Sequence, residues 1–145
     1  MRIGESVGRW VGESGEKGKG VMEKVKSFSE LEVYKSAFRI QQHIYSLSKR
    51  WPKVEDYSLT DQVRRSSRSI GASIAEAWGK RPYPAHFLSK PTDADSELQE
   101  TLHWLETARA CQYLTTDEHA ELIQLLAITG KLLGAMIARY ESFCY

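Results

Sequence analysis

The chain has 145 residues, of which 27% are charged and 41% hydrophobic, and its mean hydropathy is −0.46. This length fits one domain with a substantial core, and the composition excludes a largely disordered chain. The 20 basic and 19 acidic residues leave a formal net charge of +1, so bulk charge alone does not define a polyanion binder.

We see no apolar run of bilayer-spanning length and no signal-peptide core near Met1. We therefore expect a cytoplasmic protein that makes no membrane contact. The two cysteines, Cys111 and Cys144, indicate reduced thiols and not a disulfide framework or a zinc site.

Charge is unevenly distributed along the chain. Residues 29–90 hold 11 Lys and Arg against 6 Asp and Glu, a balance of +5, whereas residues 91–145 hold 3 against 9, a balance of −6. Such asymmetry suggests that the first half faces a phosphate backbone or another acidic surface. Pairing of the two halves with each other, or with a second copy, is the alternative.

Residues 1–28 are expected to form a flexible, glycine-rich tail, and residues 29–145 a single helical domain. Six of the ten glycines lie in the first 20 residues, and the few apolar residues there have no sustained period. Met22 stands just before the first periodic segment and is a candidate native start.

A first helix is expected over residues 30–51. Ser29 and Glu32 have the spacing of a capping box, and Pro52 ends the segment. Apolar side chains cover an arc of about 180°, broad enough to contact two neighbouring helices. These residues are Val33, Tyr34, Ala37, Phe38, Ile40, Ile44, Tyr45, Leu47 and Trp51.

The chain is organised around a second helix, over residues 59–79, for which Ser58 and Asp61 suggest another capping box. Its small residues permit close packing against a neighbouring helix, and its apolar residues follow a helical period. The stripe comprises Leu59, Val63, Ser67, Ile70, Ile74 and Trp78, and the small residues beside it are Gly71, Ala72 and Ala75.

Arg64, Arg65 and Arg68 fall on the flank and rear of this helix. Arginine forks suit phosphate and carboxylate alike. We predict a nucleic-acid-binding surface built on these arginines and extended by cations of the first two helices. The additional residues are Lys35, Arg39, Lys49, Arg50, Lys80 and Arg81.

A third helix is expected over residues 85–113, kinked at Pro91; the alternative is a helix that starts near Pro91. Glu97 falls inside its apolar arc, where an unpaired carboxylate is costly. We predict a buried ion pair with Arg64 or Arg68, the alternative being that Glu97 lies at the edge and reaches water.

A fourth helix is expected over residues 116–141, capped by Thr115 and Glu118. Its apolar residues cover more than half of the circumference, which exceeds what one bundle core requires. The excess predicts self-association through a strip of small residues. That predicted interface comprises Ala127, Gly130, Gly134 and Ala138.

Four amphipathic segments with short connections and no credible strand predict an all-α, up-down-up-down four-helix bundle. Bundles of this kind can hold two metal ions, but only one Glu-x-x-His motif is present, Glu100 with His103, and its members point away from the apolar arc. No histidine is placed to activate a serine, and no phosphate loop or dinucleotide motif occurs. We expect no metal, no cofactor and no enzymatic activity.

Residues 28–143 resemble the four-helix bundle proteins named for the intervening sequences of bacterial 23S ribosomal RNA genes. In combination the shared motifs are specific. They are Leu31-Glu32-Val33-Tyr34, Tyr57-x-Leu59-Thr60-x-Gln62-x-Arg64-Arg65, Ser69-Ile70, Ile74-Ala75-Glu76, Phe87-Leu88-Ser89-Lys90 and Glu97-x-x-Glu100-Thr101-x-x-Trp104-Leu105.

The resemblance implies an antiparallel four-helix bundle that assembles into a ring-like homopentamer without enzymatic activity. It also implies relatives among the accessory proteins of diversity-generating retroelements, which bind nucleic acid and reverse transcriptase. Two residues depart from the family pattern: Ser73 replaces a common Asn, and Pro91 replaces an ordinary helix former.

Two functions are therefore expected. The first is a non-enzymatic homo-oligomer that binds nucleic acid, most plausibly RNA, through the arginine surface. The second is a protein-interaction scaffold in which the arginines pair with Glu97 and Glu100, within or between subunits.

Overall fold

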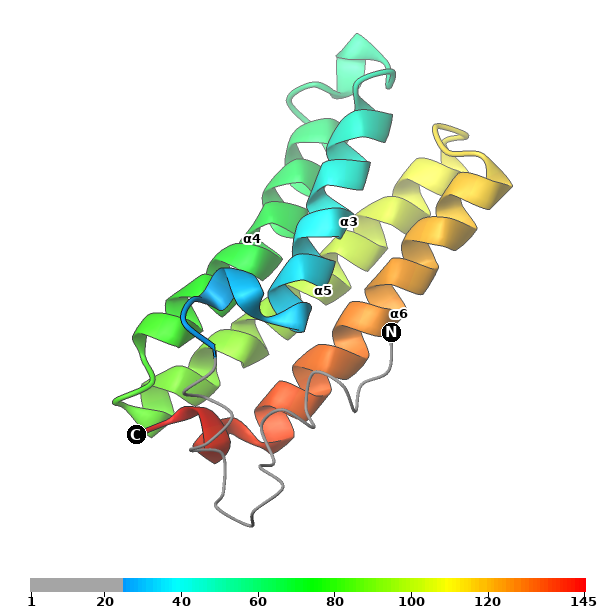
Figure 1. Cartoon of the computed structure of the whole chain (residues 1–145). Helices are drawn as coiled ribbons and strands as arrows, with labels where there is room; N and C mark the ends of the chain where they lie inside the picture. Colours follow the sequence, from blue (N-terminus) through cyan, green and yellow to red (C-terminus); the bar gives the residue numbers. More distant parts are fainter. Residues whose placement is uncertain (1–24) are drawn as a thin grey trace.

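Four long helices form the domain in a computed structural model, which describes residues 25–145 (Figure 1). They are α3 (Glu32–Ser48), α4 (Leu59–Gly79), α5 (Pro84–Ala110) and α6 (Thr116–Ala138). Three short 3-10 turns flank them: η1 (Phe28–Glu30), η2 (Lys53–Glu55) and η3 (Tyr140–Phe143). This part of the chain contains no strand. Most of the predicted tail, and Met22 with it, lies outside the described residues.

Each helix packs against its two neighbours in the order α3, α4, α5, α6 and back to α3, and the contact between α4 and α5 is the most extensive (Figure 1). Consecutive helices run in opposite directions, as short connections require. The prediction of an all-α protein with four helices is confirmed.

The core lies between the four helices and is closed at one end by η3. Phe87 of α5 is fully buried, and its ring stacks on Phe143 with centroids 5.3 Å apart. The other large, fully buried apolar side chains come from all four helices. They are Ile40, Ile44, Val63, Ile70, Ile74, Leu105, Leu122 and Leu133.

Small and hydroxyl-bearing residues let the helices approach closely. A Cβ added at Gly71 would lie 3.5 Å from Cε1 of Tyr34, so α3 places this ring directly on the backbone of α4. The hydroxyl of Thr101 donates to Ser66 Oγ over 2.9 Å and joins α5 to α4 inside the core. Both of these buried hydroxyls have a partner, as buried polar groups require.

The capping predictions have mixed outcomes. Thr115 and Glu118 form the predicted capping box on α6. Ser58 makes no side-chain cap bond, because its backbone (φ −129°, ψ −108°) is not extended, and Glu55 accepts from the Leu59 amide instead. The predicted box of Ser29 is also wrong: α3 starts later, with Leu31 as its N-cap.

Thr115→Ala should lower the free energy of unfolding by about 1 kcal/mol, because the amide that the hydroxyl caps loses its partner. The bond in question runs from the Glu118 amide to Thr115 Oγ1 over 3.1 Å. Ser58→Ala is the matched control and should leave stability nearly unchanged. Urea denaturation of both variants measures the difference, and equal losses would contradict the capping assignment.

Helix α5 is continuous through Pro91, which is buried, and it begins earlier than the alternative start near that residue. Pro84 occupies the first turn, where a missing amide costs nothing. The helix ends at Ala110, before the predicted limit at residue 113, because Gln112 adopts a positive φ of 64°.

Helix α6 is long and apolar enough to cross a membrane by length and composition, with a mean hydropathy of 1.5 in its most apolar window, of which 33% is buried. The sequence prediction that no such run exists is wrong on this point, since Lys131 is the only charge over residues 122–138. Core helices of globular proteins meet the same criterion, and α6 packs on α3 and α5.

Candidate nucleic-acid interface

Three cations converge on one tyrosine where α3 and α4 lie side by side. The ring of Tyr45 has Lys49 Nζ at 4.6 Å from its centroid, Arg64 Cζ at 5.0 Å and Arg68 Cζ at 5.5 Å. Tyr45 is 36% exposed. We call Tyr45, Lys49, Arg64 and Arg68 the Tyr45 cluster.

Helix geometry explains the cluster. Lys49 follows Tyr45 of α3 by four residues and is the C-cap of that helix, with helical backbone angles, and Arg64 and Arg68 are four residues apart on α4. Each pair therefore lies on one helix face. Ser48 fixes the arrangement, because its Oγ accepts from Arg64 Nε over 2.9 Å and donates to the Tyr45 carbonyl over 3.1 Å. One arginine is thereby held in place beside the ring.

No carboxylate of residues 25–145 lies within ion-pair distance of a cluster cation. Several other cations of the same half of the chain do have such partners. These pairs are Lys35 with Glu32 at 3.7 Å, Lys90 with Glu76 at 2.9 Å, and Arg50 with Glu118. The hydrogen bond from Arg50, together with that from the Thr115 backbone amide, lowers the pKa of Glu118 to about 2. The cluster thus gathers three cations that form no ion pair within residues 25–145, although Asp56 and Asp61 line the groove beside Arg64 and Arg68.

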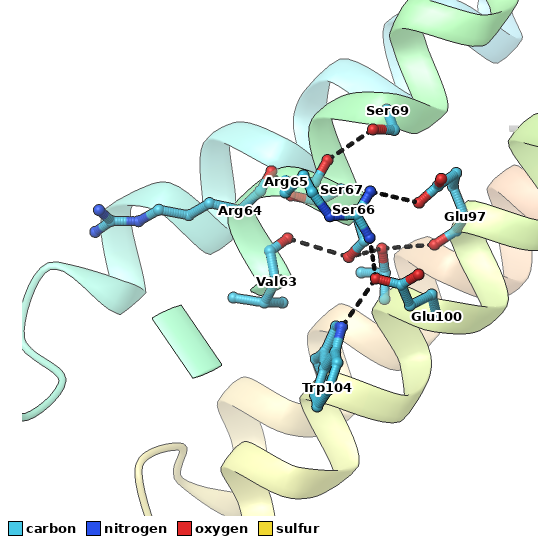
Figure 2. A network of polar contacts seen from close by, with 10 residues as sticks. Val63, Arg64, Arg65, Ser66, Ser67, Ser69, Glu97, Glu100 and Trp104 are labelled. Carbon is cyan, nitrogen blue, oxygen red and sulfur yellow. Dashed lines mark hydrogen bonds and ion pairs between the residues drawn. The ribbon is translucent and has the colours of Figure 1, made fainter. Parts of the chain in front are cut away.

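Arg65 belongs to a different network, on the α5 side of α4 (Figure 2). Its guanidinium pairs with Glu97 at 3.5 Å and with Glu100, whose Oε2 also accepts from Trp104 Nε1 over 3.1 Å. The hydrogen bond from Trp104, followed by that from Arg65, lowers the pKa of Glu100.

The predicted pairing of Glu97 with Arg64 or Arg68 is therefore wrong. Helix α4 turns Arg65 toward α5, whereas Figure 2 shows Arg64 extending away from the carboxylates. Glu97 is also only partly buried, with 26% of its side chain exposed. The alternative that it lies at the edge of the arc describes its position better.

The remaining predicted cations are not gathered at the cluster. Lys80 is the C-cap residue of α4. It follows Arg64 by 16 residues, which corresponds to about 24 Å along the helix axis. The Cζ atom of Arg81 lies 3.6 Å from the centroid of the Trp78 ring and 5.2 Å from the centroid of the Tyr145 ring. Arg39 is exposed on α3 without an ion-pair partner in the described part of the chain. The predicted surface divides into a cluster and separate outlying cations.

An open groove of about 490 Å³ adjoins the cluster on the outer face of α4. Arg64, Arg65 and Arg68 line it together with two carboxylates, Asp56 and Asp61. The groove therefore carries charges of both signs, three arginines and two aspartates. Ser69 and Ala72 complete the lining.

Tyr45 is the functional candidate that the sequence analysis missed, because the apolar period assigned its ring to the core. The available signal was its position at the margin of the arc, with a lysine four residues later on the polar side. Phe38, seven residues earlier on the same face, is 43% exposed.

The predicted self-association strip faces outward on α6. Ala127, Gly134 and Ala138 are exposed, and Gly130 is partly exposed. A Cβ added at either glycine would meet nothing within 4 Å, so these glycines are not required for packing inside the bundle. Nothing in the described chain covers the strip.

The Glu-x-x-His motif is engaged elsewhere. Glu100 accepts from Arg65 and Trp104, and the His103 ring packs on Trp104 at 4.7 Å. No group of three or more potential metal ligands occurs among residues 25–145.

Fold and surface together define a helical bundle protein with an exposed cation–aromatic face and an uncovered apolar helix face. The chain belongs to the family of 23S rRNA-intervening sequence proteins, whose family model matches residues 29–135. The family resemblance noted from the sequence is confirmed.

A solved structure supports the same assignment: a protein of unknown function from the S23 ribosomal protein family of Bacteroides thetaiotaomicron. It is 28% identical, covers 72% of this chain and 97% of its own, and superposes with a TM-score of 0.66. A comparison with curated proteins finds no match.

Proposed function

We propose that this protein is a non-enzymatic, cytoplasmic homo-oligomer that binds nucleic acid, RNA in particular, through the Tyr45 cluster. The observation that carries the proposal is the convergence of Lys49, Arg64 and Arg68 on an exposed ring without a carboxylate partner in residues 25–145. A phosphate backbone supplies the missing negative charge, and arginine forks match its geometry.

Assembly of several copies would increase the affinity for a polyanion, because one multimer would present several Tyr45 clusters to it. The outward strip of Ala127, Gly130, Gly134 and Ala138 is the proposed contact between copies, and its small side chains permit close approach of helices. The family resemblance favours a pentameric ring.

Equilibrium binding of a labelled RNA over a range of salt concentrations tests the proposed function. Backbone-led binding releases counterions, so the logarithm of the association constant should fall linearly with the logarithm of salt concentration, by about 0.7 for each phosphate neutralised on a single strand. Absence of binding at 50 mM salt, or binding insensitive to salt, would overturn the proposal.

A protein-interaction scaffold is the second candidate. Arg65 favours it, since its guanidinium is committed to Glu97 and Glu100. Arg64 and Arg68 do not share this commitment, so the scaffold leaves the Tyr45 cluster without a role.

A further inference from the structure

We propose that Tyr45 is a stacking platform for an unpaired base, so that the cluster selects single-stranded nucleic acid over duplex. This inference rests on the proposed nucleic-acid binding and adds the conformation of the ligand. The single observation behind it is the place of an exposed aromatic ring at the centre of the unpaired cations.

The ring is available for such a contact. Tyr45 is 36% exposed, and its hydroxyl has no hydrogen-bond partner within the described region, so no internal bond holds it. Phe38 lies on the same face, about 10 Å along the helix axis, and its ring stacks on Tyr34 at 6.1 Å. Aromatic surface therefore continues along α3 from the cluster toward η1.

Ligand binding would exchange weak contacts for strong ones. An exposed cation over a ring is weakly held, whereas a guanidinium or ammonium bound to a phosphate makes charge-assisted hydrogen bonds. Lys49 and Arg68 can turn from the ring to the phosphates on either side of one nucleotide, while Arg64 stays anchored by Ser48. The vacated ring face is then free to receive the base.

A duplex would not use this arrangement. In a double helix the base faces are stacked on one another, and only groove edges and phosphates reach the protein. An unpaired base exposes its face and stacks on aromatic rings with little regard to sequence.

Three RNA probes of equal length separate base stacking from phosphate binding and single strands from duplex. They are a single-stranded oligouridylate, a strand with the same phosphates but abasic sugars, and a blunt duplex. Tyr45→Leu removes the ring, and Tyr45→Phe is the matched control that keeps it. Circular dichroism and light scattering of both variants check that the fold and the assembly are kept.

We expect the parent protein and Tyr45→Phe to bind oligouridylate more tightly than either other probe. Tyr45→Leu should weaken oligouridylate binding about 5- to 150-fold, the loss of one stacked base, and leave abasic and duplex binding unchanged. Equal loss for all three probes, no loss for any, or a preference for duplex would overturn the stacking role while nucleic-acid binding stands. Failure of every probe to bind the parent protein at low salt would instead overturn the proposed function itself.

Discussion

Gly134→Arg should dissociate the assembly while making the isolated bundle more stable. Gly134 is an exposed residue of α6, and a side chain added there meets nothing within the bundle. Arginine has a higher helix propensity than glycine, so the monomer should gain roughly 0.7 kcal/mol. A long cation inside a contact of small residues would clash with, and strip water from, the facing copy.

Gly79→Arg is the matched control, because Gly79 ends α4 and is equally open. It adds the same side chain and charge away from the α6 strip. We expect light scattering to give the parental mass for Gly79→Arg and the monomer mass for Gly134→Arg at the same concentration. An unchanged mass for both variants would place the contact between copies elsewhere.

The combined variant Arg64→Glu, Arg68→Glu should lose nucleic-acid binding by about 50-fold or more at 50 mM salt. Two lost phosphate contacts account for about 1.4 in the slope of log affinity against log salt, and reversal of charge adds repulsion. Since neither arginine pairs with a carboxylate in residues 25–145, the fold and the assembly should persist.

Lys26→Glu with Arg139→Glu gives the matched control: the same change in net charge at two exposed cations outside the cluster. We expect it to reduce binding only slightly. Should the two double variants bind equally, bulk charge and not the Tyr45 cluster would govern binding. Should the arginine variant dissociate into monomers, the scaffold function would replace the proposed one.

The helices were predictable because their apolar period extends over many residues. Residues such as Ile70, Ile74 and Leu105 recur on one face, and burial of that face outweighs local preference. The termini were less predictable, since a capping box depends on two backbone angles that the residue pair does not determine. Thr115 has the required extended backbone and Ser58 does not.

The sequence predicted which arginines lie on the surface of α4, but not the direction in which each of them points. Arg64 and Arg65 are neighbours in sequence, yet a helix separates adjacent residues by 100°, so one faces α3 and the other α5. Which arginine meets Glu97 depends on how α4 is rotated against α5, and this rotation follows from packing across the whole bundle. The position of Tyr45 outside the core depends in the same way on how α3 is rotated against its neighbours.

Size-exclusion chromatography with light scattering, read together with the 260 to 280 nm absorbance ratio, tests the central claim most directly. The claim is that copies joined through α6 present unneutralised Tyr45 clusters to nucleic acid. For protein purified at low salt we expect a multimeric mass and an absorbance ratio above that of protein alone, falling after a high-salt wash while the multimer remains. A monomer that carries no nucleic acid at any salt concentration would contradict the claim.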